Sequence, residues 1–166
     1  MNNTGEITFG EAWSYGGFLM WILTLLSIAA IALVIYLVVV QWRKNFMKDA
    51  LVRIAKAKDP EAEGARIAAR LYASVDWLSD IAAIAPLVGL LGTVLGMFQA
   101  FGGIATDVAA SAKPIVLAQG VSKAIVTTIF GLGVAIPALV AHAFFRRRAS
   151  NLIAELEEKA DEVFSK

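Results

Sequence analysis

The chain has 166 residues, of which 58% are hydrophobic and 17% are charged, and its formal net charge is +1. This composition is too apolar for an ordinary soluble domain, and the small net charge gives no reason to expect nucleic acid as a partner. The sequence has no cysteine and one histidine, which excludes disulfides and thiolate metal sites and leaves no cluster from which to build a metal site.

Residues 1–16 contain two glutamates and no Lys or Arg. They lack the basic start of a signal peptide, so we expect the following apolar segment to stay in the mature chain. Residues 17–41 exceed the ~20 apolar residues that a helix needs to cross a bilayer. They are hydrophobic on every side, which predicts a first transmembrane helix that faces lipid and carries no chemistry.

Residues 42–80 change character abruptly. Eight of the fifteen basic residues lie here, namely Arg43, Lys44, Lys48, Arg53, Lys56, Lys58, Arg66 and Arg70. Asp59 followed by Pro60 is typical of a helix start, with a capping carboxylate and a proline at the first helical position. We therefore predict a short cytoplasmic loop of two helices, at about 43–57 and 60–80, the second continuing into the next span.

The second predicted span, residues 81–105, has one side almost bare of side chains. At about a hundred degrees per residue, a single stripe collects Ala82, Ala85, Gly89, Gly92, Thr93, Gly96, Ala100 and Gly103. Glycine costs ~1 kcal/mol in a helix relative to alanine, so this stripe needs a reason. Close helix packing in a membrane supplies one, and we assign Gly89, Gly92, Gly96 and Pro86 to it.

A turn at 106–113 leads to the third predicted span, residues 114–145, and to a C-terminal helix at 146–166. The span carries a second small-residue stripe: Gly120, Lys123, Ala124, Thr127, Thr128, Gly131, Ala135, Ala138 and His142. Gly131 and Pro137 are its predicted packing residues. Thr93, Thr127 and Thr128 are candidates for an ion pathway. The alternative for each threonine is a local hydrogen bond to the carbonyl three or four residues before it.

Two further side chains on the third span have two interpretations each. Lys123 is predicted near the outer edge of the hydrocarbon, where it is either an interfacial anchor or a charge in the ion path. His142 lies near the inner edge, where it is either a packing residue or a proton relay.

The basic residues also predict orientation. The 42–80 loop and the triplet Arg146, Arg147 and Arg148 lie on one side of the three spans, and the positive-inside rule assigns that side to the cytoplasm. The expected fold is an all-α membrane protein with three transmembrane helices, an outer N-terminus, a cytoplasmic C-terminus and cytoplasmic helical extensions.

Two stretches, APLVGLLGTVLGMFQAF and TTIFGLGVAIPALVAHAFF, together with the three-span order, resemble the MotA/TolQ/ExbB proton-channel family and its ExbB/TolQ-like branch. The resemblance implies an inner-membrane homo-oligomer, a pentameric ring around an ExbD/TolR-like single-span partner that carries an intramembrane Asp. It implies a translocated proton or sodium ion and no other cofactor, with Thr93 and Thr128 in the positions of the family's threonines. The chain departs from the family at Lys123, where relatives often carry an acid, and in its short cytoplasmic loop.

No Asp or Glu lies within residues 18–40, 84–104 or 115–145. A threonine hydroxyl does not titrate near neutral pH, so a proton motor built on this chain must take its carboxylate from a partner. We favour a ring subunit of an ion-motive-force-driven motor that energises envelope work such as outer-membrane transport. The alternative is a non-conducting oligomeric scaffold. An enzyme is not expected, because no nucleophile–base pair or phosphate-binding loop is present.

Overall fold

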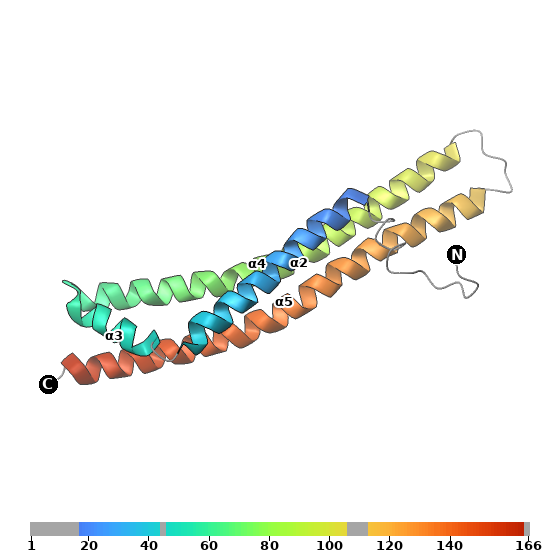
Figure 1. The fold of residues 1–166 in the computed structure, drawn as a ribbon. Coiled ribbons are helices and arrows are strands. Elements are labelled where there is room, and N and C mark those ends of the chain that lie inside the picture. The colour runs from blue at the N-terminus through green and yellow to red at the C-terminus, as the bar shows by residue number, and fades with distance from the viewer. Residues whose placement is uncertain (1–16, 44–45, 106–112, 165–166) are drawn as a thin grey trace. The chain divides into compact units, whose positions relative to one another are not determined.

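The computed structural model describes residues 17–43, 46–105 and 113–164. These residues form four helices: α2 (Gly17–Trp42), α3 (Phe46–Lys56), α4 (Pro60–Ala105) and α5 (Lys113–Phe164) (Figure 1). Three of them, α2, α4 and α5, are long and apolar enough to cross a membrane. The described chain is therefore all-helical with three candidate spans. The predicted segment 1–16 and residues 106–112 of the predicted turn lie outside the described residues.

Local sequence signals account for where the helices begin. Gly17, the first residue of α2, has a φ of 55°, a left-handed conformation that favours glycine. At the start of α4, Asp59 Oδ1 accepts a hydrogen bond of 3.1 Å from the Ala62 N–H, and Pro60 occupies the first helical position. This helix start and the continuation of the helix into the Gly-rich span are both confirmed.

The chain divides into two compact units, which are described separately. The first unit contains residues 1–28 and 81–137. Its core joins three helices: Met20 and Leu23 of α2 are buried against Ala85 of α4 and Ala135 of α5. The expectation that the first span faces only lipid is thus incomplete, because Met20 is only 1% exposed. An all-apolar sequence cannot reveal which of its sides meets protein.

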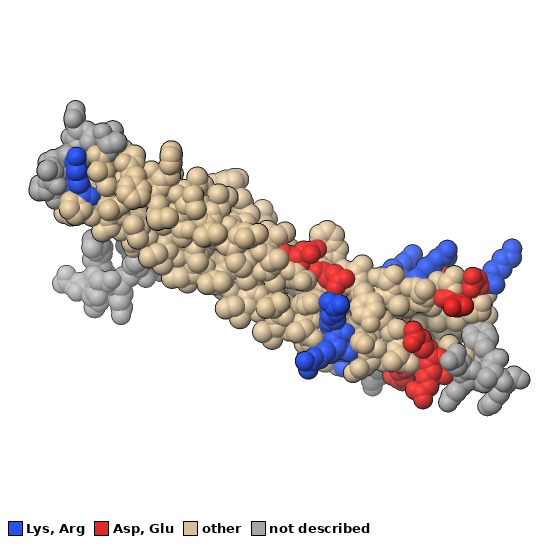
Figure 2. Space-filling view, turned by 180° about the vertical axis from the view of Figure 1, so that it is seen from behind, with Lys and Arg blue, Asp and Glu red and all other residues tan. Residues whose placement is uncertain are grey.

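The first unit carries few charged residues. Its described residues include two charged ones, Lys113 and Lys123, and no carboxylate. Figure 2 shows a broad surface free of charged side chains on the face that it draws. Large apolar side chains of this unit are exposed, among them Leu87, Phe98 and Ile129. Such a surface is suited to lipid or to other membrane helices.

The second unit contains residues 29–80 and 138–166. In its core, α3, α4 and α5 meet through Ala50, Ile54, Ile67 and Leu156. The end of α2 is joined to α5 by polar contacts. Gln41 donates through Nε2 to the Phe145 carbonyl at 3.4 Å, and the Arg148 guanidinium lies 4.6 Å from the centre of the Trp42 ring. Arg148, predicted only as part of a topology signal, therefore also holds two helices together.

Candidate functional site

The centre of the first unit is a close contact between α4 and α5, which we call the glycine interface. It consists of Ala85, Gly89, Gly92, Gly96 and Ala100 on α4 and Gly120, Ala124, Thr127 and Gly131 on α5. A Cβ added at Gly89 would lie 2.9 Å from the Thr127 carbonyl oxygen, and one at Gly131 would lie 2.7 Å from the Ala85 carbonyl oxygen. At these glycines the space that a side chain would occupy is thus filled by the backbone of the neighbouring helix. Both predicted stripes meet at this interface.

Thr127 lies inside the glycine interface. The residue is 3% exposed, and its hydroxyl oxygen is 2.7 Å from the Ala124 carbonyl oxygen and 3.1 Å from the Gly89 carbonyl oxygen. A Cβ at Gly92 would collide with the same side chain. The single hydroxyl proton of Thr127 is therefore shared between a local acceptor on α5 and an acceptor on α4.

Thr93 and Thr128 lie beside the interface and are half-buried. The Thr93 hydroxyl donates to the Leu90 carbonyl at 2.7 Å, which leaves its lone pairs available. The Thr128 Oγ1 atom is buried and has no hydrogen-bond partner among the described residues. A buried hydroxyl without a partner is costly, so a rotation of this side chain that exposes the oxygen to an outside group would be favourable.

These two threonines fall on the same edge of the glycine interface. Each lies about 60° around its helix from the middle of its own stripe, and in the same rotational sense. The contacts of Gly131 with Ala85 and of Gly120 with Ala100 show that α4 and α5 run antiparallel. When two helices run antiparallel, residues rotated away from the contact in the same direction on both helices lie on the same side of that contact. Residues that flank the contact at equivalent positions in an antiparallel coiled coil face each other for the same reason.

The first helix lies along the other edge. Val88 and Phe130, displaced around their helices in the opposite sense, pack with Met20 and Leu23 of α2. A pocket of about 410 Å³ on this edge is lined by Gly17, Gln99, Gln119 and Thr127 among others. Sequence reasoning missed the two glutamines. Their signal was a side-chain amide in each of two mostly apolar spans.

The remaining predicted site residues lie elsewhere. Lys123 is within α5, but its side chain is outside the part of the chain that the structure describes. His142 is in the second unit, with its Nε2 atom 3.9 Å from Asp76 Oδ1. Pro86 and Pro137 lie inside α4 and α5, which continue through them. Each proline lacks the N–H that would bond to the carbonyl four residues before it.

The model of the MotA/TolQ/ExbB proton channel family matches residues 42–158, which include α3, α4 and most of α5. The chain belongs to this family. The matched residues include the glycine interface and Thr93, Thr127 and Thr128. The two stretches that resemble the family therefore lie within the region that the family model matches.

Named relatives place the chain near the ExbB and TolQ members. It is 34% identical over 132 residues to the Tol-Pal system protein TolQ of Pseudomonas aeruginosa, covering 73% of this chain and 56% of that protein. It is 41% identical over 86 residues to the biopolymer transport protein exbB1 of Vibrio cholerae, and this match covers 52% of this chain and 37% of that protein. With the biopolymer transport protein ExbB of Xanthomonas campestris the identity is 37% over 98 residues, and this match covers 59% of this chain and 38% of that protein. The chain thus spans about one third to just over half the length of these relatives.

The chemistry available to this family member is set by what its apolar spans contain. Thr93 and Thr128 supply hydroxyl groups, which can donate to or accept from water, a carboxyl group or a hydrated cation. Within 18–40, 84–104 and 115–145 the sequence supplies no carboxylate. Hydroxyls can solvate an ion or a protonatable group but cannot themselves take up and release a proton near neutral pH. These three segments therefore offer hydroxyl groups for solvation and no carboxylate.

Proposed function

We propose that the chain is the ring-forming subunit of an ion-motive-force-driven motor in the bacterial inner membrane. Five copies would surround an ExbD/TolR-like single-span partner, and a proton or sodium ion would pass between ring and partner to drive envelope work such as outer-membrane transport. In this proposal the N-terminus is periplasmic and the C-terminus cytoplasmic. No enzymatic reaction is assigned to the chain.

The observation that carries the proposal is the shared edge of Thr93 and Thr128. The two threonines lie on the side of the glycine interface away from the α2 contacts, where neighbouring helices of a ring can pack. The Thr128 hydroxyl has no partner among the described residues. A partner carboxylate facing this edge would satisfy that hydroxyl once the Thr128 side chain rotates toward it, and it would supply the carboxylate that the spans lack. Family membership supports the same assignment.

One feature of the sequence favours the alternative, a ring that assembles without conducting ions. Lys123 stands where ExbB-like relatives often carry an acid, and it lies about one helical turn before Thr127 and Thr128. A lysine in place of that acid would oppose entry of a proton or sodium ion by like-charge repulsion. The motor and the scaffold would differ in whether ions flow through the complex, but both would assemble into the same oligomer.

Reconstitution with the partner separates them. We expect the chain alone in liposomes to give no proton flux above that of protein-free liposomes, because its spans lack a carboxylate. With the single-span partner, flux should appear, and replacing the partner's intramembrane Asp with Asn should remove it. A pH-sensitive dye trapped inside the liposomes reports flux, and native mass spectrometry reports the stoichiometry. A complete complex without flux under either a proton or a sodium gradient would support the scaffold.

The proposed topology has its own test, since the sequence has no native cysteine. Cysteines introduced at Thr4 or Ser111 should react in intact spheroplasts with a thiol reagent that does not cross membranes. A cysteine at Ala57 should react only after the membrane is opened, because the basic 42–80 loop is assigned to the cytoplasm. The reverse labelling pattern would overturn the orientation.

A further inference from the structure

We propose that the second unit binds the headgroup of an anionic phospholipid in a groove formed by α2, α3 and α4. The groove has a volume of about 500 Å³. One part of its lining is apolar, with Leu37 and Val40 from α2 and Leu71 from α4. The other part is polar, with Arg53 from α3 and Arg70 and Ser74 from α4. The site does not depend on whether the protein conducts ions.

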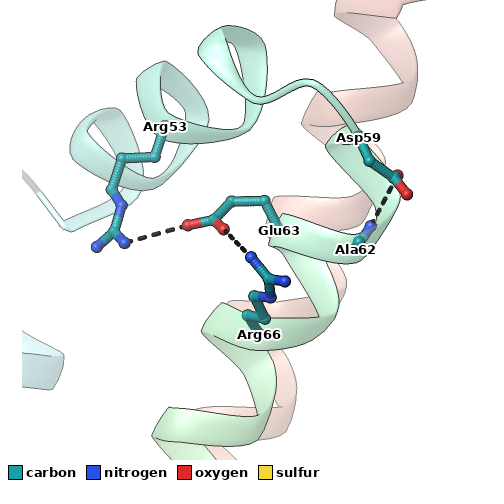
Figure 3. A network of polar contacts seen from close by, with 5 residues as sticks. All are labelled: Arg53, Asp59, Ala62, Glu63 and Arg66. Carbon is teal, nitrogen blue, oxygen red and sulfur yellow. Dashed lines mark hydrogen bonds and ion pairs between the residues drawn. The ribbon is translucent and has the colours of Figure 1, made fainter.

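The charges that line the groove are positive. Arg53 and Arg70 contribute two guanidinium groups, and no carboxylate is among the lining residues. Glu63, which lies outside the lining, is shared: its two oxygens are 3.1 Å from Arg53 and 3.7 Å from Arg66 (Figure 3). One carboxylate is therefore shared by two guanidinium groups, so it does not fully neutralise the positive charge at the groove.

Arg70 is the group left free for a ligand. Its side chain has no ion-pair partner within the described residues, and it is exposed. Arginine presents donors in a planar fork that matches phosphate oxygens, so a phosphate ester is the anion that this arrangement fits. Ser74, one turn further along α4, lines the same groove with a hydroxyl.

The apolar wall distinguishes a lipid from a soluble phosphate. The wall includes Tyr36, which is 52% exposed, and it adjoins Ile35 and Val39, which are 59% and 62% exposed on the surface of α2. Since α2 is a candidate span, these side chains lie where acyl chains would run. A molecule with a phosphate at Arg70 and hydrocarbon along α2 is a phospholipid. Basic grooves beside membrane helices on the cytoplasmic side are suited to anionic headgroups.

Native mass spectrometry of the full-length oligomer can test the site with phosphatidylglycerol and phosphatidylcholine as probes. The wild type should retain phosphatidylglycerol in preference to phosphatidylcholine. The double variant Arg53→Gln and Arg70→Gln should lower the apparent affinity for phosphatidylglycerol by roughly tenfold or more, since each basic group near an anionic surface counts for about a fivefold change. Binding of phosphatidylcholine should not change.

Arg66→Gln is the matched control. This substitution removes a guanidinium group from the same ionic network. The Arg66 side chain is 74% exposed and lies outside the groove lining, so phosphatidylglycerol binding should be retained. An equal loss in Arg66→Gln would mean a diffuse electrostatic effect and would overturn the site. Equal retention of the two lipids by the wild type would overturn it as well.

A second copy of the chain is the competing occupant of the groove. A cysteine introduced at Ala73, an exposed residue of the lining, should remain unpaired between subunits under oxidising conditions if lipid occupies the site. An inter-subunit crosslink from Ala73→Cys, together with loss of the lipid preference, would assign the groove to the neighbouring subunit instead.

Discussion

Replacing Gly131 with alanine is expected to destabilise the first unit by about 1–3 kcal/mol, the usual cost of an extra methyl group in a filled contact. The new Cβ would lie 2.7 Å from the Ala85 carbonyl oxygen and 3.2 Å from Gly89 Cα. Both neighbours belong to the backbone and cannot rotate away, so α4 and α5 must move apart. The free energy of unfolding in detergent, measured by denaturant titration, checks this result.

Gly133 gives a control two residues further along the same helix. A Cβ at Gly133 would meet nothing within 4 Å. Gly133→Ala should therefore leave the unfolding free energy unchanged or raise it by up to ~1 kcal/mol, because alanine is the better helix former. If the two alanine variants unfold alike, the glycine interface does not hold the helices together and its close geometry is incorrect.

Removing both hydroxyls of the threonine edge is expected to lower ion flux at least tenfold. Valine keeps the size of threonine and removes its hydrogen-bonding group, so Thr93→Val with Thr128→Val leaves the shape of this edge almost unchanged. A carboxyl group that loses a hydrogen-bond partner becomes harder to ionise by about 1–3 kcal/mol, and each 1.4 kcal/mol is a factor of ten in rate. Flux into liposomes that contain the complex with its partner is the measurement.

Thr127→Val separates a solvating hydroxyl from a packing one. This variant loses the bonds to the Gly89 and Ala124 carbonyl oxygens inside the glycine interface, so it should lower stability while flux per assembled complex stays near the wild-type value. The double variant should show the opposite pattern, with normal oligomer mass and low flux. Unchanged flux in the double variant would make Thr93 and Thr128 packing residues and favour the scaffold.

The amino-acid sequence by itself determined the helices and the class of the protein. Three apolar runs long enough to span a bilayer predict three membrane helices, because only such helices satisfy their backbone groups in lipid. Asp59 and Pro60 fixed the start of α4 through local capping, which needs no tertiary contact. The glycine stripes indicated close packing because glycine is too costly in a helix without it.

Only the tertiary structure decided where each threonine lies. Helical spacing grouped Thr127 and Thr128 on one stripe, but neighbouring residues lie about a hundred degrees apart, enough to separate the inside of an interface from its edge. The antiparallel pairing of α4 and α5 buries Thr127 against Gly89 and brings Thr93 and Thr128 to a common edge. The side of α2 that meets protein, and the groove beside Arg70, likewise depend on contacts between residues far apart in the chain, which no local pattern encodes.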